Sequence, residues 1–127
     1  MIASDAGVLI AHLSPVDPHH AAATGILLDA PPGSILVHSV TVAEVLLGGV
    51  RVGRGAAMRD DLRAAGVDVA PHDADEALRL AELRAGTGLK LPDCCALDVA
   101  VHHQASLATF DAALASAARR HGVVVLP

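Results

Sequence analysis

Short apolar runs alternate with longer helical segments along the whole chain, and this alternation restricts the folds that it can adopt. Each run has the length of a strand, and proline or glycine marks many of the joins. The expected strands span residues 1–5, 35–38, 67–70, 106–110 and 123–126. Strands that alternate with helices predict an α/β fold with a parallel sheet covered on both faces, in which sites form where the strands end.

Caps and helix breakers set the limits of the expected helices. A turn of helix runs to His12, and one helix starts from a cap at Ser39 or Thr41 and ends at Gly48-Gly49. Asp73 is the expected cap of a helix over 74–85, whose Leu78, Leu80 and Leu83 should mostly face inward. The other expected helices span residues 18–30, 55–65, 92–104 and 111–121.

The length and the cysteines indicate one domain in a reducing compartment. A chain of 127 residues is expected to fold as a single domain over 1–127. The N-terminus has no basic region, and Asp5 interrupts its apolar run, so we expect neither a signal peptide nor a membrane anchor. Cys94 and Cys95 are neighbours and bridge only with strain, which predicts two buried free thiols and a cytoplasmic protein.

The composition excludes two kinds of nucleic-acid protein. The chain has one Phe, no Tyr and no Trp, which is too few aromatic rings for a platform on which bases stack. Its formal net charge of -5 excludes a basic protein that coats duplexes. Neither argument excludes an enzyme that meets RNA through metal cations held by its acidic residues.

Five of the fourteen acidic residues have apolar neighbours. Asp5 ends an apolar strand, Glu44 is the only charge in an apolar helix, and Asp111 directly follows another strand. Asp93 and Asp98 lie in the segment Leu-Pro-Asp-Cys-Cys-Ala-Leu-Asp-Val-Ala-Val. Carboxylates are rarely withdrawn from water unless they are paired or bind a cation, and most basic residues lie elsewhere in the chain.

Each of these acids also has a purely structural explanation, and the sequence leaves both open. Asp5 and Asp111 can accept backbone N–H groups of the helices that follow them, and Asp93 can be a favourable anion in a first helical turn. Glu44 can extend into solvent from the edge of its helix. Asp98 lies about 140° further round its helix than Asp93, so it is expected to face away from Asp93's partners.

A cluster of carboxylates suits a hard divalent cation. Converging carboxylates repel one another unless a cation lies between them. Oxygen ligands favour Mg²⁺ or Mn²⁺ over Zn²⁺, and such an ion can activate water and stabilise charge on a phosphate. Metal-dependent hydrolysis of phosphodiester bonds is therefore the expected reaction class.

Four segments, in this order and at ordinary spacing, resemble the PIN domain, and within it the VapC group of bacterial toxins. They are Met-Ile-Ala-Ser-Asp-Ala-Gly-Val-Leu-Ile, Ser-Val-Thr-Val-Ala-Glu-Val-Leu-Leu-Gly, Leu-Pro-Asp-Cys-Cys-Ala-Leu-Asp-Val-Ala and Leu-Ala-Thr-Phe-Asp. The resemblance implies a three-layer α/β/α domain with about five mainly parallel strands. It also implies a Mg²⁺- or Mn²⁺-dependent endoribonuclease, inhibited by a cognate antitoxin whose C-terminal segment occupies the active-site groove, and commonly a homodimer.

The resemblance also implies roles for individual residues. Asp5 and Asp93 match the two principal metal ligands of the family, and Glu44 matches the helical acid that completes the pocket. Asp111 matches the fourth acid of a Thr-x-Asp element, in which the hydroxyl of Thr109 orients water or Asp111. No role is carried over to Asp98.

The remaining features of the sequence leave further possibilities open. Arg51, Arg54, Arg59 and Arg63 form the one local concentration of positive charge, which either binds RNA phosphates or forms a solvated face with Asp60 and Asp61. The eight histidines, with no zinc-binding pattern, are expected to face solvent.

Two other classes of protein are alternatives to a nuclease. One is a catalytically silent PIN-like module that binds RNA or protein. The other is a phosphoacceptor receiver domain, which needs a pair of acids after the first strand, an Asp at the end of the third and a Lys near the last. The chain has only Asp5, Ala70-Pro71 and a loop residue, Lys90, at these places.

Overall fold

The computed structural model describes all 127 residues and contains five strands and seven helices. In chain order they are β1 (Ile2–Ser4), α1 (Ala6–Leu13), α2 (His20–Asp29), β2 (Ile35–Val37), α3 (Ser39–Arg51), α4 (Gly55–Ala64), β3 (Val67–Val69), α5 (Glu76–Thr87), α6 (Leu91–His102), β4 (Ser106–Ala108), α7 (Ala112–Arg120) and β5 (Val125–Leu126). The alternation of strands and helices that the sequence predicts is confirmed.

All five strands are parallel and form one sheet in the order β3-β2-β1-β4-β5. β1 lies at the centre, where Ala3 pairs with Leu36 of β2 on one side and with Leu107 of β4 on the other. Because the strands run in one direction, the residues that follow β1, β2, β3 and β4 all emerge at the same edge. This is where the expected site residues Asp5 and Thr109 lie.

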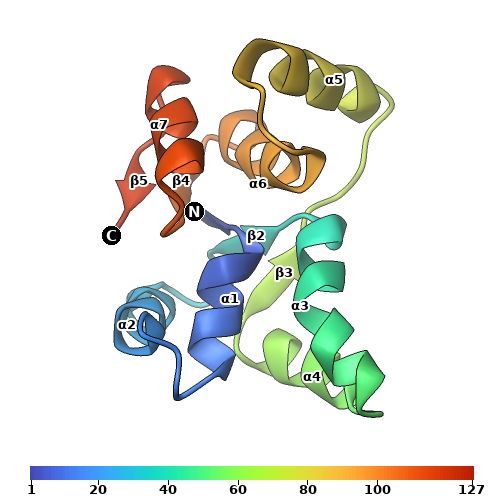
Figure 1. Ribbon diagram of the computed structural model, residues 1–127, viewed down its shortest axis with the longest axis vertical. Coiled ribbons are helices and arrows are strands. Elements are labelled where there is room, and N and C mark those ends of the chain that lie inside the picture. Colours follow the sequence, from blue (N-terminus) through green and yellow to red (C-terminus); the bar gives the residue numbers. More distant parts are fainter.

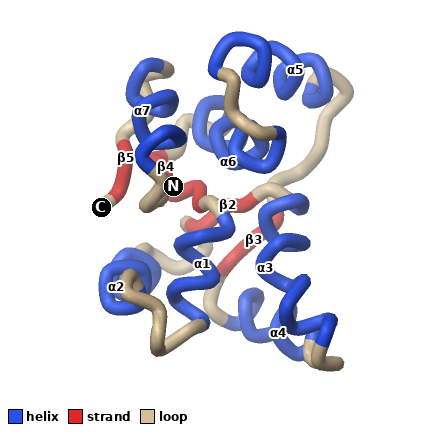
Figure 2. The backbone as a smooth tube through the Cα atoms, viewed as in Figure 1, coloured by secondary structure: helices blue, strands red, loops and turns tan.

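Helices cover both faces of the sheet, so the predicted three-layer α/β/α arrangement is confirmed (Figures 1 and 2). Side chains of successive strand residues point to opposite faces. Ala3 and Leu107 pack with α6 and α7 in the largest core cluster, against which Leu80 and Leu83 of α5 also pack. On the other face, β2 and β3 pack with α1, α3 and α4, while α1 and α2 pack against Ala108 of β4.

The start and end of α3 differ from the sequence prediction. His38, rather than Ser39 or Thr41, caps the helix, because its ring Nδ1 accepts the N–H of Val40 at 3.0 Å. The helix also continues through Gly48-Gly49 to Arg51. Gly49 is buried, and a Cβ at this position would lie 2.0 Å from Sδ of Met58, so the glycine allows α4 to pack closely rather than ending α3.

The first turn of α5 also differs from the prediction. The helix begins at Glu76, and Asp73 does not cap it; its carboxylate instead accepts the N–H of Asp75 at 2.9 Å and pairs with Arg79. Leu78 is 62% exposed, so the prediction that it faces inward is wrong, whereas Leu80 and Leu83 do pack against the core.

The prediction for the cysteines is confirmed. Cys94 and Cys95 are buried as free thiols in α6. None of the helices combines the length and the apolar character that a membrane crossing requires.

Candidate active site

Asp5 follows β1 and is fixed by a different donor at each carboxylate oxygen. Oδ1 accepts the N–H of Val8 at 3.0 Å and thereby caps α1, and Oδ2 accepts the hydroxyl of Thr109. Burial raises the pKa of the Asp5 carboxyl, the hydrogen bonds from Thr109 and Val8 oppose this rise, and the charge of Asp111 adds to it. Asp5 is thus held in one orientation in a place that disfavours its charge.

The Thr109–Asp111 element after β4 joins the same network. Thr109 is buried, and its hydroxyl accepts the N–H of Asp111 at 3.0 Å while it donates to Asp5. Asp111 is exposed and caps α7, because its Oδ1 accepts the N–H of Leu114 at 2.8 Å. The ends of β1 and β4 are therefore connected by one chain of hydrogen bonds.

Asp93 and Glu44 reach this edge from two helices. Asp93 lies in the first turn of α6, and Glu44 lies in the middle of α3. Burial raises the pKa of Asp93 above its usual value, and the charges of Asp111, Asp5 and Glu44 raise it further. The other three acids are thus close enough to disfavour the charge on Asp93.

None of these four carboxylates forms an ion pair within 4.0 Å; every salt bridge of the protein involves other acids. Lys90 lowers the pKa of Asp93, but by less than burial and each of the other three acids raises it. No three of the four acids place oxygens within 4.8 Å of one another. The structure therefore holds an acidic site with unbalanced negative charge, spread around an edge rather than concentrated at one point.

The sequence suggested that all of these acids are withdrawn from water, but the structure buries only some of them. Asp5 and Asp93 are half-buried, but Glu44 and Asp111 are exposed. The apolar neighbours of Glu44 include Val40 and Leu47, which are 38% and 49% exposed themselves. An apolar sequence environment therefore does not mean burial on this helix, and Glu44 extends from its edge into solvent.

Asp98 is the buried acid of the group, and it lies away from the acidic site as predicted. The guanidinium of Arg79 donates to it from Nε at 2.8 Å and from Nη2 at 3.0 Å. Hydrogen bonds from the same guanidinium hold the pKa of Asp73 at about 2. This pairing fastens α5 to α6, which explains Asp98 without a role in the site.

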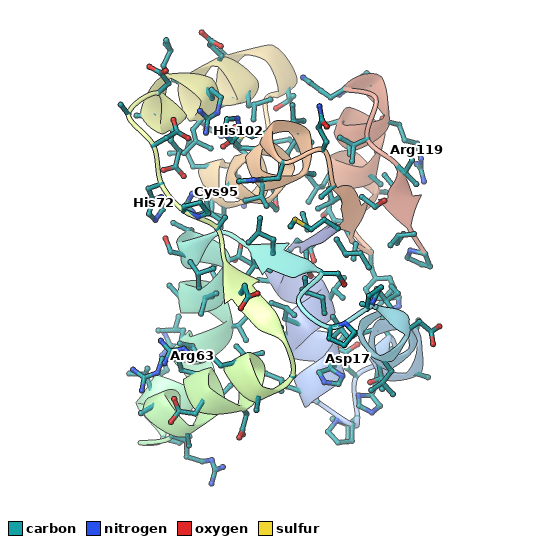
Figure 3. All side chains as sticks on the ribbon, turned by 180° about the vertical axis from the view of Figure 1, so that it is seen from behind. Asp17, Arg63, His72, Cys95, His102 and Arg119 are labelled. Carbon is teal, nitrogen blue, oxygen red and sulfur yellow. The ribbon has the colours of Figure 1, made fainter.

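A second polar cluster at the carboxyl edge was not predicted. Glu76 accepts a hydrogen bond at Oε1 from Nε2 of His38, and its Oε2 lies 2.6 Å from Nδ1 of His72, on the loop that follows β3 (Figure 3). Burial alone would raise the pKa of Glu76, but the hydrogen bonds with His72 and His38 outweigh this and lower it. The expectation that the histidines face solvent is thus wrong for His38, which is 5% exposed. The sequence does carry a signal for this cluster: a His directly follows β2, and a His-x-x-x-Glu segment follows β3.

The chemistry of this second cluster opposes a metal ion. One ligand atom from each of His38, His72 and Glu76 lies within 4.8 Å of the others. Nδ1 of His38 accepts the N–H of Val40, so the hydrogen of the neutral ring is on Nε2, which faces Glu76. A nitrogen that carries a hydrogen has no lone pair for a metal, and the cluster is a hydrogen-bonded connection between α3 and α5.

The predicted basic stretch lies at the end of α3 and on α4. Arg51, Arg54, Arg59 and Arg63 are all exposed. Arg59 and Arg63 face Asp60 at 3.2 and 4.0 Å, as the solvated alternative expects, whereas Arg51 and Arg54 form no ion pair.

The protein is a small α/β/α domain with unpaired acids at the carboxyl edge of a parallel sheet. Its sequence shows to which family of such domains it belongs. The family model of the PIN domain matches residues 2–120, so the chain belongs to the PIN-domain family. This membership contradicts the receiver-domain alternative. No curated protein matches the sequence closely enough to count as a relative.

Solved structures agree with this assignment. A toxin–antitoxin complex from Klebsiella pneumoniae is 26% identical with a TM-score of 0.72, over 87% of this chain and 85% of that chain. VapC20 of Mycobacterium tuberculosis, described as a toxin that cleaves the sarcin–ricin loop, is 21% identical with a TM-score of 0.78 over the whole of both chains. FitAcB from Neisseria gonorrhoeae is 21% identical with a TM-score of 0.73, over 100% of this chain and 97% of that chain. At 21% identity, the latter two share the fold with this chain.

Proposed function

We propose that this protein is a metal-dependent endoribonuclease and the toxin of a toxin–antitoxin pair in the cytoplasm. The observation that carries the proposal is the group of four unpaired carboxylates, Asp5, Glu44, Asp93 and Asp111, at one edge of a PIN-domain sheet. The likeness to the toxin–antitoxin complex of Klebsiella pneumoniae and to an RNA-cleaving toxin supports the choice of substrate and partner.

The acidic site has the donor chemistry of a hard divalent cation. Its ligands are carboxylate oxygens. Burial and then their mutual repulsion raise the pKa of Asp93, and a bound cation offsets this cost of the charge. Mg²⁺ commonly binds one or two carboxylates directly and keeps several waters. Because no three acids lie within 4.8 Å, we assign Asp5 and Asp93 to direct binding and Glu44 and Asp111 to its waters.

The protein's own groups fix the position of the reaction. A bound Mg²⁺ or Mn²⁺ activates water and neutralises charge on the scissile phosphate. Thr109 holds one oxygen of Asp5, Val8 holds the other, and the N–H of Asp111 holds Thr109. The position of Asp5, one of the two proposed direct ligands, is therefore set before RNA arrives, which lowers the cost of orienting the reacting groups.

Arg51 and Arg54 are the residues of the basic stretch that we propose to contact RNA. They are exposed and unpaired, so their charges are available to phosphates. Arg51 follows Glu44 by seven residues in α3, which places both on one side of the helix about 10 Å apart. Arg59 and Arg63, which face Asp60, contribute less.

The proposed partner is an antitoxin segment that covers a groove beside the acidic site. The groove has a volume of about 380 Å³ between α1, α3 and α4, and its lining includes Ile10, Leu13, Met58 and Glu44. An apolar segment of the antitoxin that lies here reaches Glu44 and blocks access to the acids. We also propose a homodimer, since apolar side chains such as Val50 and Leu28 are 61% and 76% exposed.

Cleavage of a structured RNA by the purified chain tests the function. We expect cleavage with Mg²⁺, none with EDTA, and none by Asp5→Asn or Asp93→Asn, because each removes a proposed ligand charge. Asp29→Asn is the matched control, since Asp29 is exposed and has no ion pair. Cleavage that persists in EDTA and in both site variants indicates a contaminating nuclease and contradicts the proposal.

Expression in cells separates the nuclease from a catalytically silent module. The wild-type chain should arrest growth, Asp5→Asn should not, and a cognate antitoxin should restore growth. Arrest by both forms of the chain points instead to toxicity through binding alone.

A further inference from the structure

The single phenylalanine of the chain lies inside the Thr109–Asp111 element and carries a second ring. Phe110 is half-buried against the core between α1 and α2. The imidazole of His19 stacks on it, with ring centroids 4.3 Å apart and planes 11° from parallel. We propose that His19 and Phe110 form a stacking subsite for a nucleobase of the bound RNA, an inference that rests on the proposed function.

The outer side of the stack is free to bind a ring. His19 is exposed, and its ring nitrogens take part in no hydrogen bond or ion pair of the protein. Only its backbone is fixed, because its N–H donates to Asp17 at 2.8 Å. One face of the imidazole lies on Phe110, so the opposite face is available to a base, and the free nitrogens are available to its edge.

The backbone of Phe110 adjoins two residues of the acidic site. Phe110 is the residue between Thr109, whose hydroxyl binds Asp5, and Asp111, whose N–H binds Thr109. Consecutive Cα atoms are only about 3.8 Å apart. His19 precedes α2, and Ala23 of α2 belongs with Ala108 of β4 to the core cluster against which Phe110 packs. Figure 1 shows where α2 and β4 lie in the fold. An RNA strand with a phosphate at the acids therefore has an adjoining nucleotide within reach of the stack.

This subsite changes the conclusion drawn from the lack of aromatic residues. One Phe is too little for a platform, but its stacking with an exposed imidazole gives a two-ring surface next to the acidic site. Stacking tolerates any base, because every base has a π-face. The subsite therefore holds the strand in place and adds affinity without strict sequence preference.

RNA binding by His19 variants tests the inference. Measurements use the Asp5→Asn chain with Mg²⁺, in which we expect no cleavage, and a single-stranded RNA that carries the fluorescent base 2-aminopurine. We expect His19→Ala to weaken binding about 5- to 150-fold and to relieve the quenching of the probe. His19→Phe should restore both, and His19→Leu should restore neither. His121→Ala, which removes an exposed imidazole directly after α7, is the control and should bind normally.

Kinetics in the chain with Asp5 intact give an independent readout. His19→Ala should raise KM with little change in kcat, because the base contact is made before and during reaction. Unchanged binding by His19→Ala, or equal restoration by His19→Leu and His19→Phe, overturns the stacking subsite. If the wild type cleaves RNA in either case, the proposed function stands while this inference fails; if it neither binds nor cleaves RNA, both fail.

Discussion

At the scale of single residues, the same carboxylates serve the fold and the acidic site. Asp5 caps α1 with one oxygen, and Asp111 caps α7 with one oxygen. Capping needs an acceptor but no charge, and Asn is as good a cap as Asp. Burial raises the pKa of Asp5, so its negative charge is a cost that capping does not require, which is typical of residues at functional sites.

Asp93→Asn should stabilise the metal-free protein. The pKa of Asp93 is raised above 3.8, so folding favours its protonated form and its charge costs stability above the folded pKa. In EDTA at neutral pH, we expect the variant to melt about 1–4 °C higher than the wild type, a gain that disappears below about pH 4. Mg²⁺ should raise the melting temperature of the wild type more than that of the variant.

Thermal unfolding with and without EDTA across this pH range checks the prediction. Asp29→Asn serves as the control, because Asp29 is exposed and unpaired. A lower melting temperature for Asp93→Asn in EDTA would mean that the carboxylate stabilises the start of α6 and that repulsion is unimportant.

At the scale of elements, α3 connects several functions of the molecule. His38 caps it and links it to Glu76 of α5, Glu44 extends from its middle, and Gly49 gives close contact with α4. Two adjacent glycines in this helix have different surroundings: a Cβ at Gly48 meets nothing within 4 Å, and one at Gly49 meets Met58.

Gly48→Ala and Gly49→Ala should therefore have opposite effects on stability. Alanine at 48 favours the helix, with an expected gain of about 0.5–1 kcal/mol in the free energy of unfolding. At 49, the new Cβ forces Met58 or α4 to move, with an expected loss of about 1 kcal/mol. Urea unfolding measures both, and Gly49→Ala with Met58→Ala should recover part of the helix gain. Equal gains at both positions would contradict the close α3–α4 packing.

At the scale of the whole molecule, the net charge of -5 hides an uneven distribution. Four acids lie around the carboxyl edge, and the exposed and unpaired Arg51 and Arg54 lie at the far end of α3. A cation at the edge and these two arginines further along α3 give a path for a polyanion across an acidic protein. RNA binding should therefore depend on both the divalent ion and the salt concentration.

Neutralising Arg51 and Arg54 together should weaken RNA binding without stopping the chemistry. We expect Arg51→Gln/Arg54→Gln to raise KM about 3- to 10-fold, leave kcat nearly unchanged, and reduce the salt dependence of binding. Arg119→Gln/Arg120→Gln, at the exposed end of α7, removes the same charge elsewhere. If the two double variants behave alike, the effect reflects overall charge and the basic stretch is a solvated surface.

The sequence predicted the elements well where local signals are strong. Apolar runs marked all five strands, and the helices expected over 55–65 and 111–121 are followed by Gly66 and Gly122, both of which have positive φ angles in the structure. It failed where a distant residue decides the outcome. The sequence predicts a helix end at Gly48-Gly49, because nothing in the neighbouring residues shows that Met58 packs against Gly49.

For the candidate site, the sequence found the residue types and their order. It could not tell that Glu44 and Asp111 are exposed, or that Asp98 and Arg79 form a buried pair across two helices. It also missed the link of His38 with Glu76 and the stack of His19 on Phe110, whose partners are 38 and 91 residues apart.

The sequence by itself determined the alternation of strands and helices, the parallel sheet and the set of acids at strand ends and on helices. These follow from short-range periodicity and from the one direction of parallel strands. The tertiary structure alone decided which acids stay unpaired, which histidine nitrogen carries a hydrogen, and which rings meet. Burial, charge balance and contact depend on which helices pack over the sheet, and no local pattern in a single chain encodes them.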